Sequence, residues 1–126
     1  MKSWRNKNLE DIKQGDIYWV DFGDPDGSEP AYKHPCVVVQ NNVFNKSKIK
    51  TVVVCLITSN LRRAEAPGNV LIKKGEGNLK KDSVVNISQI LTVNKKDLIK
   101  KIGALNTGKI NRIIEGIKIL IEPRDI

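Results

Sequence analysis

Residues 15–40 read GDIYWVDFGDPDGSEPAYKHPCVVVQ, and residues 51–58 read TVVVCLIT. Both stretches contain hydrophobic segments rich in valine and isoleucine, which favour β-strands. The valine runs at 37–39 and 52–54 are continuous rather than alternating, a pattern typical of strands covered on both faces. Together with two later segments of similar composition, they predict strands at residues 17–22, 36–40, 51–57, 69–72 and 84–90.

The pattern changes after residue 93 and predicts helices. Asn94 can cap a short helix with Asp97 in its first turn, and that helix would contain Leu98, Ile99 and Ile102. A second helix follows, with apolar residues at three-and-four spacing and Pro123 at its end. Its apolar face is expected to dock on the sheet through Ile110, Ile113, Ile114, Ile117, Leu120 and Ile121. The fold class is therefore mainly β with C-terminal helices.

Length and charge define the general class. A chain of 126 residues predicts a single domain at 15–126, preceded by a polar N-terminal extension at 1–14, and a domain this small benefits from dimerisation. The net charge of +8 favours a phosphate-rich partner such as nucleic acid, with a merely solvated lysine-rich surface as the alternative. No segment resembles a signal peptide or reaches membrane-spanning length, so a cytoplasmic protein without membrane contact is expected.

The two cysteines fall inside predicted strands. Cys36 and Cys55 are therefore expected to be buried free thiols, although a disulfide is conceivable if the two strands pair in the right register. Two cysteines and one histidine without close spacing do not form a zinc signature. The sequence predicts neither a metal nor a cofactor.

The loop between the first two strands is acidic. Asp24 and Asp26 belong to Asp-Pro-Asp-Gly, which is strong turn chemistry, and a calcium loop counted from Asp24 would place Pro35 where glutamate is required. The calcium interpretation therefore fails. Glu29 lies outside the turn and is a candidate for pairing with a cation or for contacting an RNA base.

The second strand begins with a basic pair. Pro35 biases His34 toward an extended backbone, so the side chains of Lys33 and His34 should point to opposite faces and only one should face a site. Histidine suits proton transfer, whereas lysine suits charge-based phosphate binding. A purely structural role for the histidine is the alternative.

Hydroxyls and further basic residues follow the third strand. Thr58 and Ser59 can donate to phosphate oxygens, or they can instead cap the free backbone of the strand. Four basic side chains are candidate phosphate contacts, and simple solvation is the alternative for each. They are Arg62, Arg63, Lys46 and Lys48.

These segments, in this order, resemble the MazF/PemK family of toxin endoribonucleases from type II toxin-antitoxin systems. The resemblance covers the chain from about residue 15 and is carried by the opening strand at 15–22, Gly-Ser-Glu at 27–29, the strand from Pro35, the strand ending in Thr58, Asp-Ser-Val at 82–84 and Ser-Gln-Ile at 88–90. The helical end matches only in pattern.

The resemblance implies an SH3-like barrel of the MazF/PemK/CcdB type, acting as a homodimer. It also implies metal-independent cleavage of single-stranded RNA, in which the 2′-hydroxyl attacks the phosphate to leave a 2′,3′-cyclic phosphate and a 5′-hydroxyl. The family has a threonine that Thr58 matches and an arginine before the proline, where this chain has His34. Either His34 takes that role as general base or acid, or Lys33 takes it and an easy proton acceptor is lost.

The resemblance further implies a cognate antitoxin protein that covers the basic groove. Two rival functions stay open: a non-catalytic RNA-binding module that keeps the barrel but lacks the arginine, and a gyrase-poisoning toxin on a similar barrel. The Gly-Ser-Glu and Pro35 signatures favour the ribonuclease over the second rival.

Overall fold

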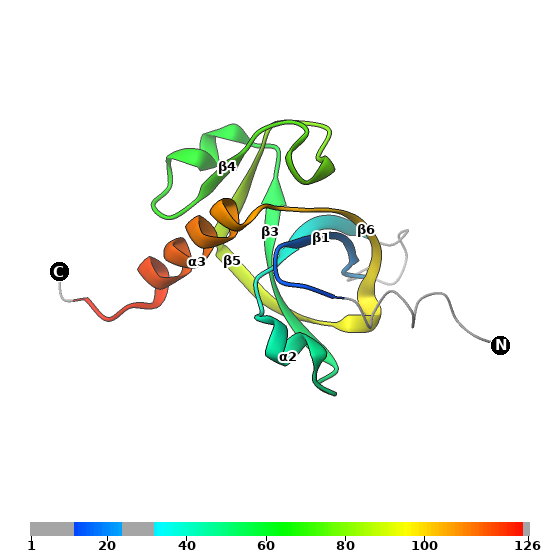
Figure 1. Ribbon diagram of the computed structural model, residues 1–126. Helices are drawn as coiled ribbons and strands as arrows, with labels where there is room; N and C mark the ends of the chain where they lie inside the picture. Colours follow the sequence, from blue (N-terminus) through cyan, green and yellow to red (C-terminus); the bar gives the residue numbers. More distant parts are fainter. Residues whose placement is uncertain (1–11, 24–31, 125–126) are drawn as a thin grey trace.

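The computed structural model describes residues 12–23 and 32–124, which form one curled antiparallel sheet with a C-terminal helix (Figure 1). The six strands have the order β4-β5-β3-β2-β1-β6. Their bounds are β1 Asp16–Asp21, β2 Lys33–Val38, β3 Thr51–Thr58, β4 Val70–Ile72, β5 Ser83–Asn94 and β6 Leu98–Ala104. The helices are α2 Asn42–Lys46 and α3 Thr107–Ile121, with short 3-10 turns η1 Leu61–Glu65, η2 Glu76–Asn78 and η3 Lys95–Asp97.

The curl of the sheet follows from the connection between β5 and β6. Three other strands lie between them in the sheet, yet only the three residues of η3 join them in sequence. The sheet must therefore bend until the end of β5 reaches the β6 edge, where β6 pairs with β1 (Figure 1). The expected mainly β fold and all five predicted strands are confirmed.

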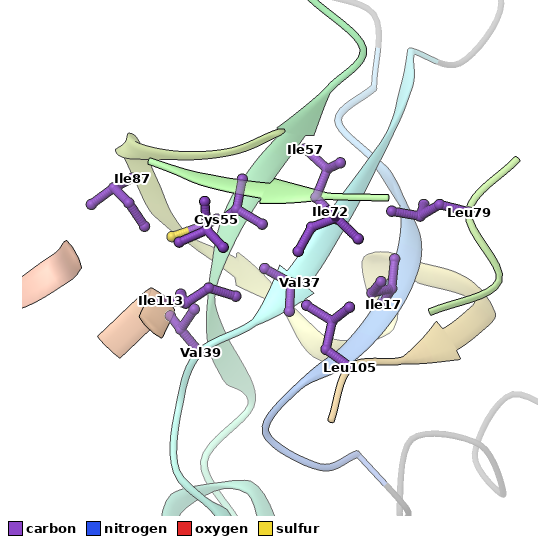
Figure 2. Packing of buried hydrophobic residues seen from close by; sticks show 12 residues of the cluster. Ile17, Val37, Val39, Cys55, Ile57, Ile72, Leu79, Ile87, Leu105 and Ile113 are labelled. Carbon is purple, nitrogen blue, oxygen red and sulfur yellow. The ribbon is translucent and has the colours of Figure 1, made fainter. Parts of the chain in front are cut away.

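The core has two parts, one on each face of the central strands. Val37 and Cys55 lie in one cluster, whereas Cys36 and Val54 lie in the other, because successive side chains of a strand point to opposite faces. Figure 2 shows the first cluster, with Ile113 of α3 beside Cys55 and Val39. The continuous valine runs thus reflect burial on both faces, as predicted.

The prediction of a short helix after Asn94 is wrong. Only η3 is helical there, and the segment LIKKIGA forms β6, whose register with β1 pairs Lys101 with Tyr18 and Lys100 with Trp19. Isoleucine-rich segments are compatible with both structures, and pairing with a strand edge decides between them. The lysines face outward on this edge strand, an arrangement that discourages further strand addition. The chain therefore has one C-terminal helix where two were predicted.

The remaining helix, α3, ends just before Pro123 as predicted, but its apolar face is covered only in part. Asn106 caps it by accepting a hydrogen bond from the Lys109 backbone N–H, at 2.9 Å. Ile113 is buried at 1% exposure, whereas Leu120 is 46% and Ile121 69% exposed. The C-terminal end of α3 projects beyond the sheet (Figure 1), so the expected docking holds as far as Ile117 but not for Leu120 and Ile121.

Two glycines bring the loop before β5 onto β6. A Cβ atom on Gly103 would overlap the Gly77 carbonyl oxygen, and one on Gly77 would overlap the Ile17 side chain. Gly77 also has a φ of +59°, in the left-handed region that glycine adopts most readily. The side-chain amide of Asn78 then donates to the Ile102 carbonyl at 3.0 Å. This close contact holds residues 77–81 beside the sheet.

The predicted extension at 1–14 falls mainly on residues outside the described range. Its last residues pack on the domain: Ile12 is 3% exposed in the second core cluster, and the Gln14 side chain donates to the Val39 carbonyl at 2.8 Å. Among the described residues, no helix is long and apolar enough to cross a membrane.

Candidate functional site

A cavity of about 460 Å³ opens at the end of the sheet where β2 begins and β3 ends. Because these strands are antiparallel neighbours, the first residues of one and the last residues of the other meet there. The buried side chains of Ile57 and Leu79 belong both to the core and to the cavity wall (Figure 2). The other lining residues are Trp19, His34, Pro35, Thr58, Ser59, Asn78, Lys80, Lys81, Ser83 and Ile102.

His34 lines this cavity, whereas Lys33 is exposed and does not. The alternation predicted for the two side chains is therefore present, and the histidine is the one that faces the cavity. Its Nε2 lies 2.6 Å from the Tyr32 hydroxyl oxygen, and the two rings meet edge to face with centroids 4.6 Å apart. The imidazole can accept or donate a proton at this position.

Thr58 and Ser59 reach the same cavity from the end of β3. The Thr58 hydroxyl oxygen accepts a hydrogen bond from the Asn60 backbone N–H at 3.1 Å, so it does cap the backbone there. A hydroxyl that accepts still has its own proton to donate. The Thr58 hydroxyl can therefore cap the backbone and donate to a phosphate oxygen at the same time.

The cations that line the cavity are Lys80 and Lys81, both exposed at their outer ends. They lie in the loop that Gly77 and Gly103 hold against the sheet. Sequence reasoning recognised them only as part of the general basic surface, because nothing local shows that this loop reaches the entrance of β2. An ammonium group at such a position attracts phosphate as a point charge.

The other predicted phosphate contacts lie elsewhere. Arg62 and Arg63 are exposed on η1, just after Ser59 but outside the cavity lining. Lys46 and Lys48 precede β3, and Thr58 lies at the other end of this eight-residue strand, which is about 23 Å long. Glu29 lies outside the described residues.

Trp19 is a lining residue that sequence reasoning did not single out. It lies opposite Pro35 in the β1–β2 register and is 40% exposed, while its neighbours in β1 are buried. The signal in the sequence that could have identified Trp19 is a large aromatic residue at an outward-facing strand position, since such rings commonly serve as stacking surfaces. Its ring can stack against a base entering the cavity.

A polar network outside the cavity lining connects an irregular part of β5 to η1. In β5, Cys55 pairs with Ile90 and Leu56 with Asn86, so the residues between them bulge out of the ladder. The Asn69 side chain accepts from the Ile87 backbone N–H at 2.8 Å and donates to the Arg63 carbonyl at 2.9 Å. One amide thus ties the bulge to η1.

Neither cysteine can serve as a nucleophile here. Burial raises the pKa of the Cys36 thiol to about 12, with Cys55 adding a smaller effect, and burial raises the pKa of Cys55 to about 12 as well. Both are free thiols. Across residues 12–23 and 32–124, no three histidine, cysteine or acidic side chains gather closely enough to hold a metal ion.

The fold and the cavity define a small mainly β protein with a pocket lined by lysines and hydroxyl groups, a chemistry suited to phosphate. Comparison with known proteins agrees with this class. Residues 13–121 match the family model described as PemK-like, MazF-like toxin of type II toxin-antitoxin system. The chain belongs to this family.

Named relatives are similar over nearly their whole length. Endoribonuclease MazF6 of Mycobacterium tuberculosis and endoribonuclease MazF2 of Mycobacterium bovis are each 37% identical over 111 residues, covering 88% of this chain and 97% of the relative.

Solved structures share the fold. A mycobacterial endoribonuclease in complex with its cognate antitoxin superposes with a TM-score of 0.72 at 23% identity, covering 90% of this chain and 99% of that one. The MazE-MazF structure from Deinococcus radiodurans has a TM-score of 0.74 at 15% identity, covering 90% and 97%.

Proposed function

We propose that this protein is the toxin of a toxin-antitoxin pair and an endoribonuclease that cleaves single-stranded RNA in the cavity between β2 and β3. Membership of the PemK-like, MazF-like family and 37% identity to named endoribonucleases support this activity. One observation supports a location for this activity. His34 and Thr58, from neighbouring strands, line one cavity together with Lys80 and Lys81.

The proposed reaction needs no group beyond these side chains and water. The ribose 2′-oxygen attacks the adjacent phosphorus, its proton passes to His34, and the bond from phosphorus to the 5′-oxygen breaks. The departing 5′-oxygen takes up a proton from water, and the hydroxide left behind removes the proton from His34, which restores the neutral imidazole. The products are a 2′,3′-cyclic phosphate and a 5′-hydroxyl. The histidine acts as general base.

The remaining lining residues stabilise the negative charge that develops on the phosphoryl oxygens. Thr58 donates a hydrogen bond to one of them, while Lys80 and Lys81 supply positive charge beside it. Trp19 offers a stacking surface for a base next to the cut. Lys33 is assigned no proton-transfer role, since it lies outside the lining.

The proposed partners are a cognate antitoxin and a second copy of this chain. Proteins of the same fold have been solved with their antitoxins, which supports the first. The exposed Leu120 and Ile121 at the end of α3 support the second, because an apolar helix end gains stability when a partner covers it. A cytoplasmic location is part of the proposal, and it is supported by the proposed RNA substrate.

The experiment is cleavage of a mixed single-stranded RNA pool by the purified protein with a chelator present, followed by end-group analysis. Cyclic phosphate and 5′-hydroxyl ends are expected. Salt-sensitive binding without products would instead support a non-catalytic RNA-binding module, which the replacement of the family arginine by His34 makes the main rival. Inhibition of gyrase supercoiling without RNA products would support a gyrase poison.

A further inference from the structure

The phenol of Tyr32 is hydrogen-bonded to one of the two ring nitrogens of His34. The Tyr32 hydroxyl oxygen lies 2.6 Å from His34 Nε2, the distance of a strong hydrogen bond. A neutral imidazole carries one protonated and one unprotonated nitrogen, and a phenol can donate or accept, so the direction of this hydrogen bond determines whether Nδ1 can act as a base. Tyr32 is thus in a position to control the proton chemistry of His34.

The surrounding backbone holds Tyr32 in this position. The Phe22 backbone N–H donates to the Tyr32 carbonyl at 2.8 Å, and the Tyr32 N–H donates to the Gly23 carbonyl at 3.3 Å, which extends the pairing of β1 and β2. The Phe22 ring lies 6.4 Å from the Tyr32 ring and 6.2 Å from the His34 ring. Three rings therefore form one cluster around the histidine.

We infer that Tyr32 is a positioning residue that holds His34 in the tautomer with the proton on Nε2, leaving Nδ1 to accept the proton from the RNA 2′-hydroxyl. This inference rests on the proposed function. Nε2–H donates to the Tyr32 oxygen, and the proton released in the attack forms a new bond to Nδ1. A general base oriented by a third group is a recurrent arrangement in nucleophile activation.

His34 is the single histidine of the chain, so its imidazole resonances in NMR spectra are unambiguous. The substitution Tyr32→Phe removes the hydroxyl and keeps the ring in the aromatic cluster. Long-range proton–nitrogen spectra of the neutral ring should show mainly the Nε2–H tautomer in the unmodified protein and a mixture of tautomers in Tyr32→Phe. The same tautomer population in both proteins would overturn the inference, whatever the activity.

Kinetics separate positioning from a direct role in RNA binding. Tyr32→Phe should lower kcat on the order of 10-fold or more, as removal of an orienting partner commonly does, and should leave KM within about twofold. An unchanged kcat, or a loss confined to KM, would overturn the inference.

A double-mutant comparison tests whether Tyr32 acts through the histidine. In the His34→Ala background, adding Tyr32→Phe should leave the residual rate unchanged, whereas an equal loss in both backgrounds would show an independent role and overturn the inference. If the unmodified protein does not cut RNA, the proposed function fails, while the tautomer measurement still decides the role of Tyr32. Thermal melting of each variant controls for folding.

Discussion

Cys36 and Cys55 lie on neighbouring strands but on opposite faces of the sheet. Val37, not Cys36, pairs with Cys55, and the two thiols belong to different core clusters. The strand register therefore separates them by the thickness of the sheet, which answers the question left open by the sequence. Both are buried free thiols.

The two thiols should make stability depend on pH above about 9. Their pKa is raised from 9.0 to about 12, so between these values the unfolded chain loses the protons that the folded chain keeps. The free energy of unfolding should then fall with rising pH, by at most about 1.4 kcal/mol per pH unit for each thiol. Urea titrations between pH 8 and pH 11 measure this, and Cys36→Ala should show the weaker dependence. An identical slope in the variant would contradict the prediction.

His34→Ala should reduce RNA cleavage by about 10² to 10⁴-fold, the usual contribution of a general base, while the protein stays folded. Lys33→Ala is the matched control, because its exposed side chain lies outside the cavity, and it should keep most of the activity. Initial rates on one RNA substrate compare the two. A larger loss for Lys33→Ala would move the proton-transfer role to the lysine.

Thr58→Val should lower the cleavage rate, because it removes a donor that faces the phosphate while keeping the β-branched shape of the side chain. Loss of one such donor typically costs about 10²-fold or more. The backbone N–H of Asn60 loses its partner as well, so melting temperatures must accompany the rates. A rate equal to that of the unmodified protein would exclude Thr58 from the site.

Lys80→Ala and Lys81→Ala should each weaken RNA binding and flatten its salt dependence. Each lost phosphate contact on a single strand reduces the slope of log K against log salt by about 0.7. Lys118→Ala, which removes an exposed lysine on α3, is the control and should leave the slope unchanged. Equal slopes for the cavity variants and this control would remove both lysines from the RNA path.

Gly103→Ala should destabilise the fold by about 1–3 kcal/mol, since the new methyl group overlaps the Gly77 carbonyl and forces the two segments apart. Gly108→Ala, in the first turn of α3, is the control: its nearest contact, Asn106 Oδ1, would be at an acceptable 3.4 Å, and alanine favours a helix. Denaturant unfolding compares them. If Gly103→Ala also lowers cleavage at a temperature where it is folded, the loop position matters for the site.

Leu120→Asp should dissociate the proposed homodimer without unfolding the chain, because this side chain is 46% exposed in the single copy. Val43→Asp changes a 78% exposed aliphatic residue on α2 and should leave the oligomeric state unchanged. Sedimentation at matched concentrations distinguishes the two. A dimer that survives Leu120→Asp would place the contact elsewhere on the molecule.

Much of the fold is predictable from local sequence, and the exception has a definite cause. The valine runs can form only well-covered strands, and the isoleucine spacing after residue 107 fits only a helix. The segment LIKKIGA is compatible with a helix and with a strand, so its structure depends on a distant partner, the edge of β1. A pairing between the two ends of a curled sheet has no local signature.

The same distinction applies to the site. The resemblance to the family groups His34 with Thr58, and the antiparallel pairing of β2 with β3 brings these two strand ends together. Lys80 and Lys81 could not be placed there from the sequence, since they reach the cavity through glycine packing between Gly77 and Gly103. In the sequence, Lys46 and Lys48 are candidate phosphate contacts like the other basic residues, but the length of β3 separates them from Thr58.

The closure of the curled sheet by β6 also affects when the cavity forms during synthesis of the protein. The cavity combines Trp19 of β1 with Ile102 of β6, so its wall is incomplete until nearly the whole chain has left the ribosome. Pairing between such distant segments closes late in folding, because the loop entropy must be overcome first. The proposed RNA site is therefore incomplete during most of the synthesis of the chain.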